Sequence, residues 1–109
     1  MKTRKRFSWL VGISILLILF STSALAKEIK IGVIFDYTGP FAAGGSEPAA
    51  IGTKIAIEMI NERGGVEGYM IKAFHADAQS KAEVAINEAE RLLSQEKVDL
   101  LMGVYSSGH

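Results

Sequence analysis

The stretch EIKIGVIFDYTGPFAAGG, residues 28–45, decides the fold of this chain. Its first eight residues, EIKIGVIF, are rich in β-branched side chains and nearly continuous in apolar character, which is typical of a strand buried on both faces. The remainder, DYTGPFAAGG, contains Gly and Pro and predicts a loop. Strands covered on both faces occur mainly in parallel sheets flanked by helices, so this stretch favours an α/β fold.

Downstream of this loop, residues 46–63 predict a helix with Ser46 as its N-cap and Pro48 in its first turn. Gly64 and Gly65 supply the left-handed residues that end a helix. The inward face is expected to carry the apolar residues and the outward face the polar ones. These are Ile51, Gly52, Ile55, Ala56, Met59 and Ile60 on the inward face, and Lys54, Glu58, Asn61 and Glu62 on the outward face.

A second strand is expected at residues 69–75, and a second helix begins where Ser80 and Glu83 have the spacing of a capping box. The apolar residues of that helix recur at steps of three and four, and they are Ala82, Ala85, Ile86, Ala89, Leu92 and Leu93. A third buried strand is predicted at residues 98–104. The order β-α-β-α-β implies right-handed crossovers and a doubly wound, Rossmann-like parallel sheet.

Upstream, residues 1–26 have the three parts of a secretory signal peptide in the required order. Four basic residues, Lys2, Arg4, Lys5 and Arg6, precede the apolar run WLVGISILLILF at residues 9–20. The small-residue sequence Ala-Leu-Ala at residues 24–26 then predicts cleavage before Lys27. The alternative is a membrane anchor, because residues 7–26 carry no charge, but the Ser/Thr run at residues 21–23 favours a cleaved signal.

Without residues 1–26, the chain has 8 basic and 12 acidic residues and is mildly acidic. No basic cluster remains for a nucleic acid. Cysteine is absent, so neither disulfides nor a lipid-anchored cysteine is expected, and the predicted location is the periplasm. The region of residues 27–109 is small for a domain, and GVYSSGH at residues 103–109 resembles the middle of a motif, so we expect an N-terminal fragment.

Ligands of doubly wound sheets bind beyond the carboxyl ends of the strands, which makes three loops informative: residues 36–45, 76–79 and 105–109. If a helix follows His109, the hydroxyls and backbone N–H groups around Ser106 and Ser107 suit an anion such as a carboxylate. The alternative is that one of these serines only caps that helix.

Other chemistry is poorly supported by the sequence. His75 and Asp77 point to one side of a strand, but no further metal ligand stands nearby. A serine-hydrolase elbow would place Tyr105 at the nucleophile position, and His109 is too close to Ser106 to be a convincing base. No catalytic residue, metal or cofactor is therefore assigned. Besides a protein that binds an anionic ligand at these loops, the sequence leaves two alternatives open. They are an exported α/β enzyme of the hydrolase type and a non-functional truncated binding protein.

Several motifs occur together in one order: IKIGVIFDYTGPFAAGG, INERGGVEG, Asp77 followed by Gln79 and Ser80, and MGVYSSG. In this combination the chain resembles the type I periplasmic solute-binding proteins of ABC transporters, in the branched-chain amino acid (leucine/isoleucine/valine) group with its amide- and urea-binding relatives. The resemblance implies two lobes that close over a small ligand and deliver it to a permease in the inner membrane. Residues 27–109 would be the first βαβαβ part of the first lobe.

The resemblance also implies binding residues. Ser107 falls where the family holds the α-carboxylate of the ligand with a serine hydroxyl and backbone N–H, and Tyr105 and Ser106 edge the pocket. Gly44 stands where a bulky aromatic is frequent, so the ligand is expected to be larger or to be contacted by Tyr37, Phe41 or Tyr105 instead. Asp77 matches a frequent family acid, and we expect it to order the turn that follows it. The implied ligand is a branched-chain amino acid, an amide, urea or an aromatic acid.

Overall fold

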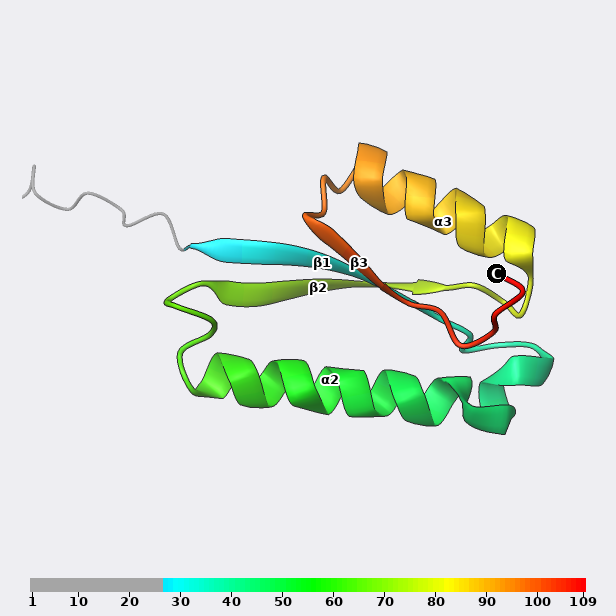
Figure 1. Ribbon diagram of the computed structural model, residues 1–109, viewed down its shortest axis with the longest axis horizontal. Helices are drawn as coiled ribbons and strands as arrows, with labels where there is room; N and C mark the ends of the chain where they lie inside the picture. The colour runs from blue at the N-terminus through cyan, green and yellow to red at the C-terminus, as the bar shows by residue number, and fades with distance from the viewer. Residues whose placement is uncertain (1–26) are drawn as a thin grey trace, which may run out of the picture.

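The computed structural model describes residues 27–109, which form a three-stranded sheet and two main helices (Figure 1). In chain order the elements are β1 (Glu28–Phe35), the short π-helix η1 (Ala42–Ser46), α2 (Glu47–Glu62), β2 (Met70–Asp77), α3 (Ala82–Ser94) and β3 (Leu100–Gly103). The predicted alternation of strands and helices is confirmed. The predicted signal peptide, residues 1–26, lies outside the described residues.

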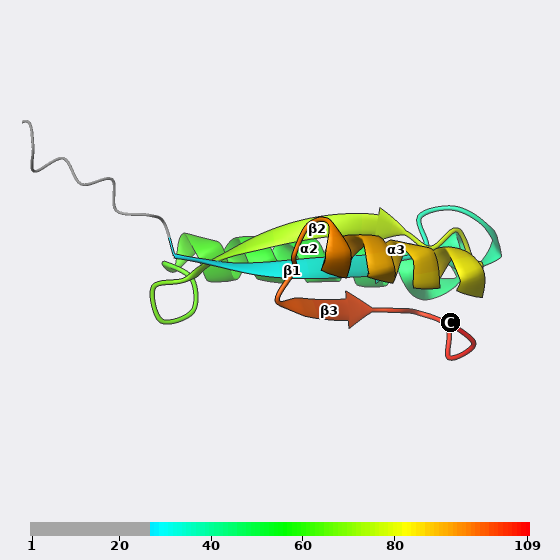
Figure 2. The same cartoon turned by 90° about the horizontal axis from the view of Figure 1, so that it is seen from above.

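The sheet has the order β2-β1-β3, and both pairings of the central strand β1 are parallel. β1 pairs along its whole length with β2, from Glu28 opposite Met70 to Phe35 opposite Asp77. The helices cover opposite faces, with α2 below the sheet and α3 above it in Figure 1, and Figure 2 shows the same layers from above. All three strands therefore end at one edge of the sheet, where the loops that follow them meet.

The alternating side chains of β1 form two small cores. Val33 and Phe35 pack with Ala50 of α2 on one face. Ile34 packs on the other face with Leu92 of α3 and with buried residues of the neighbouring segments, which are Ala76, Ala78, Ala85 and Val98. The prediction that this strand is buried on both faces is confirmed, and β1 holds the two layers together.

The third strand was predicted incorrectly as a buried strand at residues 98–104. β3 is shorter, and all four of its residues are exposed, because it lies at an edge of the described sheet and pairs only with β1. Val98 is buried, but it packs into the core from the loop before the strand. Strand length was therefore overestimated from an apolar run that includes a core residue of the loop.

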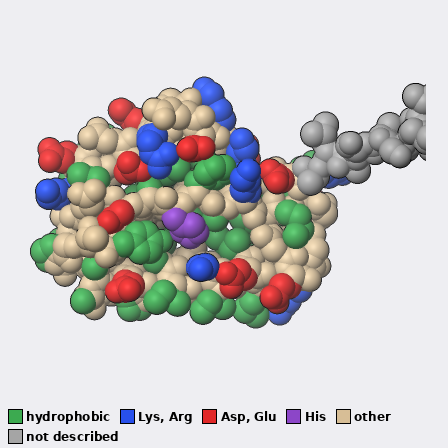
Figure 3. Space-filling view, turned by 180° about the vertical axis from the view of Figure 1, so that it is seen from behind, with side chains coloured by type: hydrophobic (Ala, Val, Ile, Leu, Met, Phe, Trp, Pro, Cys, Tyr) green, Lys and Arg blue, Asp and Glu red, His purple; other side chains and the backbone are tan. Residues whose placement is uncertain are grey.

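The predicted inward face of α2 is also wrong in part. Ile51, Ile55 and Met59 are 53%, 50% and 47% exposed, whereas Ala50 and Ile57 contact the sheet. Figure 3 shows hydrophobic and acidic side chains together along the lower edge of the molecule, over α2. Apolar residues occupy most of the circumference of this helix, so their spacing alone does not select the face that packs on the sheet.

Asn61, predicted on the polar face of α2, joins the helix to the sheet. Its side-chain amide donates to the carbonyl of Ile71 at 2.8 Å and accepts from the N–H of Ile71 at 2.8 Å. The glycines that end the helix have φ values of 98° at Gly64 and 81° at Gly65, so the predicted left-handed stop is confirmed. These two hydrogen bonds fix the C-terminal end of α2 against the start of β2.

Ser46 stands at the predicted N-cap position of α2 but makes no side-chain cap hydrogen bond, and Ser80 is not the N-cap of α3. The hydroxyl of Ser46 accepts the N–H of Asp36 at 2.6 Å, and the chain is already helical before α2 because η1 leads into it. Ser80 precedes the N-cap Lys81, and its hydroxyl accepts the N–H of Phe41 at 3.0 Å and donates to the carbonyl of Thr38 at 3.0 Å. The hydroxyl of Ser46 therefore closes the loop that begins at Asp36, and the hydroxyl of Ser80 joins two segments that are distant in the sequence.

The carboxylate of Asp77 orders its own turn, as expected, and also holds the loop after β1. One oxygen accepts the N–H groups of Gln79 at 2.8 Å and Tyr37 at 2.9 Å, and the other accepts the hydroxyl of Thr38 at 2.7 Å. Burial alone would raise the pKa of Asp77, but the hydrogen bonds from Thr38, Gln79 and Tyr37 outweigh it and lower the pKa below its ordinary value.

The lowered pKa of Asp77 predicts how stability changes with pH. A carboxylate with a depressed pKa stabilises the folded state above the pKa of the unfolded chain, about 4, and this contribution is lost as pH falls through the lower folded pKa. In urea unfolding, Asp77→Asn should be less stable than the wild type at about pH 6, and the difference should shrink below about pH 4. Glu58→Gln, at an exposed position, is the control. A gap between Asp77→Asn and the wild type that does not change with pH would contradict this role.

Gly103 predicts a second, local effect on stability. Its φ is +114°, and a Cβ there would overlap the carbonyl oxygen of Ile34 on β1. Gly103→Ala should therefore cost about 1–3 kcal/mol in the free energy of unfolding, because β3 must move away from β1. Gly52→Ala is the matched change within α2, where a Cβ meets nothing within 4 Å, and it should stabilise by up to about 1 kcal/mol. Equal melting temperatures for the two variants would show that the close approach of β3 to β1 at Gly103 does not affect stability.

Candidate functional site

The three loops that follow the strands meet around Asp36, at the carboxyl end of β1. We call them the first loop (residues 36–46), the second loop (78–81) and the third loop (104–109). Asp36 donates its N–H to Ser46 of the first loop, and its Oδ1 accepts the N–H of Ser80 in the second loop at 2.8 Å. The same oxygen lies 3.9 Å from Nδ1 of His109 in the third loop. A single fully buried residue therefore contacts all three loops.

Tyr105 closes the third loop onto the first. Its hydroxyl donates to the carbonyl of Gly44 at 3.1 Å, and its ring lies 6.4 Å from the ring of Phe41, centroid to centroid. A Cβ at Gly45 would come within 2.6 Å of the Tyr105 ring, so the close approach needs a glycine there. At Gly44 a Cβ would meet nothing within 4 Å. Two of the predicted site residues, Tyr105 and Gly44, are thus brought together, with open space at Gly44.

The two predicted serines form a tight turn next to Tyr105. Ser106 accepts the N–H of Gly108 on its hydroxyl at 3.2 Å and the N–H of His109 on its carbonyl at 3.2 Å. Ser107, between these partners, is exposed. The turn presents Ser107 to solvent beside the contact between the first and third loops. The carboxylate-binding role of Ser107 stays a prediction.

Tyr37, a further predicted contact residue, is directed elsewhere. Its hydroxyl lies 3.2 Å from Nδ1 of His75, and both residues line a hollow of about 260 Å³ against α2. Burial raises the pKa of the Tyr37 hydroxyl, and the nearby charge of Asp77 raises it further. Of the three aromatic residues considered, Phe41 and Tyr105 therefore adjoin at the first and third loops, whereas Tyr37 faces His75.

Within residues 27–109, no group of three side chains has the arrangement of a metal site. No hydrogen bond among the described residues joins the imidazole of His109 to a serine, and Nδ1 of His109 has no hydrogen-bond partner there. The described part therefore lacks the base-to-serine hydrogen bond that activates the nucleophile of a serine hydrolase. None of the helices described from residue 27 onward is long and apolar enough to span a membrane.

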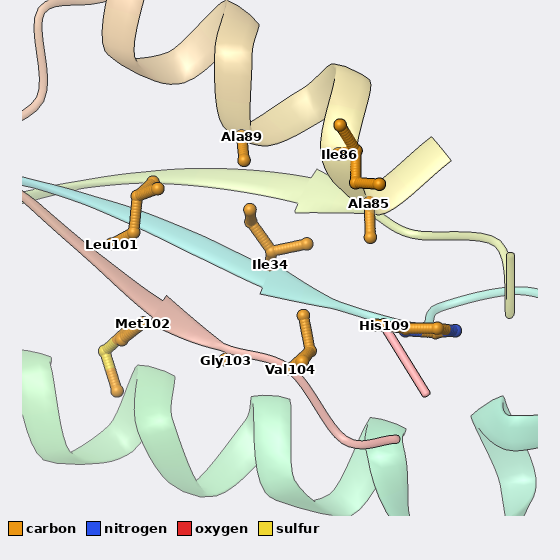
Figure 4. A pocket seen from close by; sticks show the side chains of 9 residues that line it. All are labelled: Ile34, Ala85, Ile86, Ala89, Leu101, Met102, Gly103, Val104 and His109. Carbon is orange, nitrogen blue, oxygen red and sulfur yellow. The ribbon is translucent and has the colours of Figure 1, made fainter. Parts of the chain in front are cut away.

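A separate hollow lies between α3 and β3 (Figure 4). Its volume is about 230 Å³, and apart from His109 its lining is apolar, with Ile34, Ile86 and Leu101 among the contributors. None of the predicted ligand-binding residues lines it. A zwitterionic ligand needs convergent polar groups, so this hollow does not match the chemistry expected at the loops.

Asp36 was not among the residues predicted from the sequence, although the loop that it begins was. A usable signal was available, because a charged residue directly after a central buried strand lies at the edge where ligands of parallel sheets bind. The partnership with His109 was not predictable in this way, since 73 positions separate the two residues.

Comparison with known proteins gives a consistent result. A family model described as periplasmic binding protein matches residues 28–109. Leu/Ile/Val-binding protein homolog 7 of Brucella suis is 38% identical over 99 residues, and homolog 8 of Brucella abortus is 33% identical over 100 residues. These alignments cover 91% and 90% of this chain but only 24% of each relative.

Solved structures agree with the sequence relatives. The substrate-binding protein LivJ of the branched-chain amino acid transporter from Streptococcus pneumoniae, in complex with isoleucine, matches with a TM-score of 0.72 at 33% identity. The match covers 75% of this chain and 23% of that one. A branched-chain amino acid ABC transporter periplasmic ligand-binding protein from Burkholderia xenovorans matches with a TM-score of 0.61 at 27% identity, over 74% of this chain and 21% of that one.

The family model covers residues 28–109, and both the sequence relatives and the solved structures match most of this chain. The resemblance inferred from the motifs is confirmed, and the chain is an α/β piece that spans about a quarter of the length of its curated relatives. The chain belongs to the periplasmic binding protein family.

Proposed function

We propose that this chain is part of the extracytoplasmic substrate-binding component of an ABC importer, which binds a small amino acid or amino-acid-like solute and delivers it to a membrane permease. The observation that carries the proposal is the contact of Tyr105 with Gly44, which brings the first and third loops together at the carboxyl edge of the sheet. The relatives named as Leu/Ile/Val-binding proteins and the isoleucine complex of LivJ support the ligand class.

In this proposal, Ser107 holds the ligand carboxylate with its hydroxyl and backbone N–H. It is exposed within a turn that is held by two hydrogen bonds, from the N–H groups of Gly108 and His109 to the hydroxyl and carbonyl of Ser106. The hydroxyl of Ser107 takes part in neither bond, so it is available to a ligand. Phe41 and Tyr105 offer aromatic surface beside it, and both are partly exposed. Aromatic rings bury a large apolar area and suit the side chain of an amino acid.

The space at Gly44 determines the size of ligand in this proposal. A Cβ there meets nothing within 4 Å, whereas the adjacent Gly45 leaves no room because Tyr105 packs against it. The pocket edge is therefore open at one position and closed at the next. We infer that the ligand, or its side chain, extends over Gly44, which favours a larger solute than a pocket with an aromatic residue at this position would accept.

The first prediction from this proposal concerns Ser107. A hydrogen bond to a charged carboxylate contributes about 1.5–3 kcal/mol, so Ser107→Ala should weaken binding of the preferred amino acid roughly tenfold to a hundredfold. Isothermal titration calorimetry of the full-length protein against branched-chain and aromatic amino acids, amides and urea provides the measurement. Ser94→Ala is the matched control, because Ser94 bonds only within α3. If no solute in this panel binds to the wild type, the proposed function is wrong.

The second prediction concerns ligand size. Gly44→Trp should fill the open space, lower the affinity for the largest ligand that binds and preserve or improve the affinity for a smaller aliphatic one. The ratio of the two dissociation constants, measured by calorimetry, is the readout. A Gly44→Trp variant that weakens large and small ligands equally would show that the space at Gly44 does not select ligand size.

A further inference from the structure

The outward face of α2 carries an apolar stripe that none of the described elements covers. Ile51, Ile55 and Met59 follow one another at intervals of four residues, and each is about half exposed. Residues four apart lie one above another on the same side of an α-helix, so the three side chains form one continuous stripe. Ala50 and Ile57 pack on the sheet from the opposite side of the helix. In Figure 1, α2 is the lowest of the described elements, with the sheet and α3 above it.

Two opposite charges flank the stripe on one side. Lys54 and Glu58 are also four residues apart and both are exposed, so they lie together beside the stripe. This is the side of β2, because Lys54 lines the hollow that contains His75 of that strand. The ion pairs found within residues 27–109 involve neither Lys54 nor Glu58. The same flank of the stripe is therefore positive toward the N-terminal end of α2 and negative toward its C-terminal end.

We propose that this face is a self-association surface, on which two copies of the chain pair through antiparallel α2 helices. A two-fold axis brings the same flank of both helices together and reverses their direction. Lys54 of each copy then stands opposite Glu58 of the other, which gives two equivalent ion pairs. The apolar stripes meet between them, with Ile55 packed between Ile55 and Met59 of the second copy. A parallel pair would bring opposite flanks together, so neither charge would meet the other. The charge pattern thus selects the antiparallel orientation.

The expected association is weak. A contact along one helix face is small beside the roughly 800 Å² per partner of a standard protein interface. We expect a dissociation constant on the order of 10–100 μM, which leaves the protein monomeric at the low micromolar concentrations of unfolding experiments. None of the predicted ligand-binding residues lies on α2, so this association does not depend on the proposed function.

A charge exchange across the two-fold axis tests the proposal. Sedimentation velocity of the full-length protein without ligand, from about 1 to 300 μM, should show a transition from monomer to dimer in the wild type. The dissociation constant should rise about tenfold in Lys54→Glu and in Glu58→Lys, because like charges then face each other. The double variant Lys54→Glu/Glu58→Lys restores opposite charges and should return to within about threefold of the wild type. Glu90→Lys, at an exposed position of α3, is the matched control and should not change the dissociation constant.

The rescue separates pairing from loss of folding, because the double variant carries both changes. A wild-type protein that stays monomeric over the whole range, or a double variant that associates as weakly as the single ones, would overturn the proposal. Ile55→Glu distinguishes a second copy from cover by the remainder of the full-length chain. With a second copy on the stripe, the dimer is lost while the melting temperature of the dilute protein is kept. A melting temperature that falls in the dilute monomer would show that the chain itself covers the stripe, and the proposal would be wrong.

Discussion

The buried carboxylate of Asp36 is the interaction on which the arrangement of the loops depends. It stands at the end of β1, the strand that pairs on both sides and carries residues of both cores. One of its oxygens accepts the amide of Ser80, and its own N–H is bonded to the hydroxyl of Ser46. The hydroxyl of Ser46 therefore bonds back to the end of the central strand and makes no cap hydrogen bond to α2. The first and second loops are thus joined to the carboxyl end of β1 through Asp36.

Two further contacts give the loop edge its shape. The Asp77 carboxylate holds the start of the first loop, and Tyr105 holds its end through the carbonyl of Gly44. Between them, the hydroxyl of Ser80 bonds to Thr38 and Phe41 in the middle of the loop. A Gly-containing segment that would be mobile in isolation is therefore held at several points. A loop that is already ordered loses less conformational entropy when a ligand binds, so this order favours binding.

Sequence patterns predicted the framework well and the contacts poorly. The nearly continuous apolar run of β1 and the paired glycines after α2 are local signals, and the structure confirms both. The side-chain caps expected at Ser46 and Ser80 are absent because each hydroxyl bonds to a backbone N–H outside the helix, 10 residues away for Ser46 and 39 residues away for Ser80, beyond the span of a capping motif. The face of α2 was ambiguous because apolar residues surround most of it. Gly44 and Tyr105 were named through a family resemblance, while the burial of Asp36 depends on three loops at once.

In the proposed function, the loop edge, with Ser107 and the surface of Phe41 and Tyr105, binds a small amino-acid-like solute. The decisive measurement is a crystal structure of the protein grown with isoleucine. Ligand density is expected at the carboxyl ends of β1 and β3, with the carboxylate within hydrogen-bond distance of the Ser107 hydroxyl and backbone N–H. Ligand density remote from this edge, for example in the apolar hollow between α3 and β3, or a ligand carboxylate with no contact to Ser107, would contradict it.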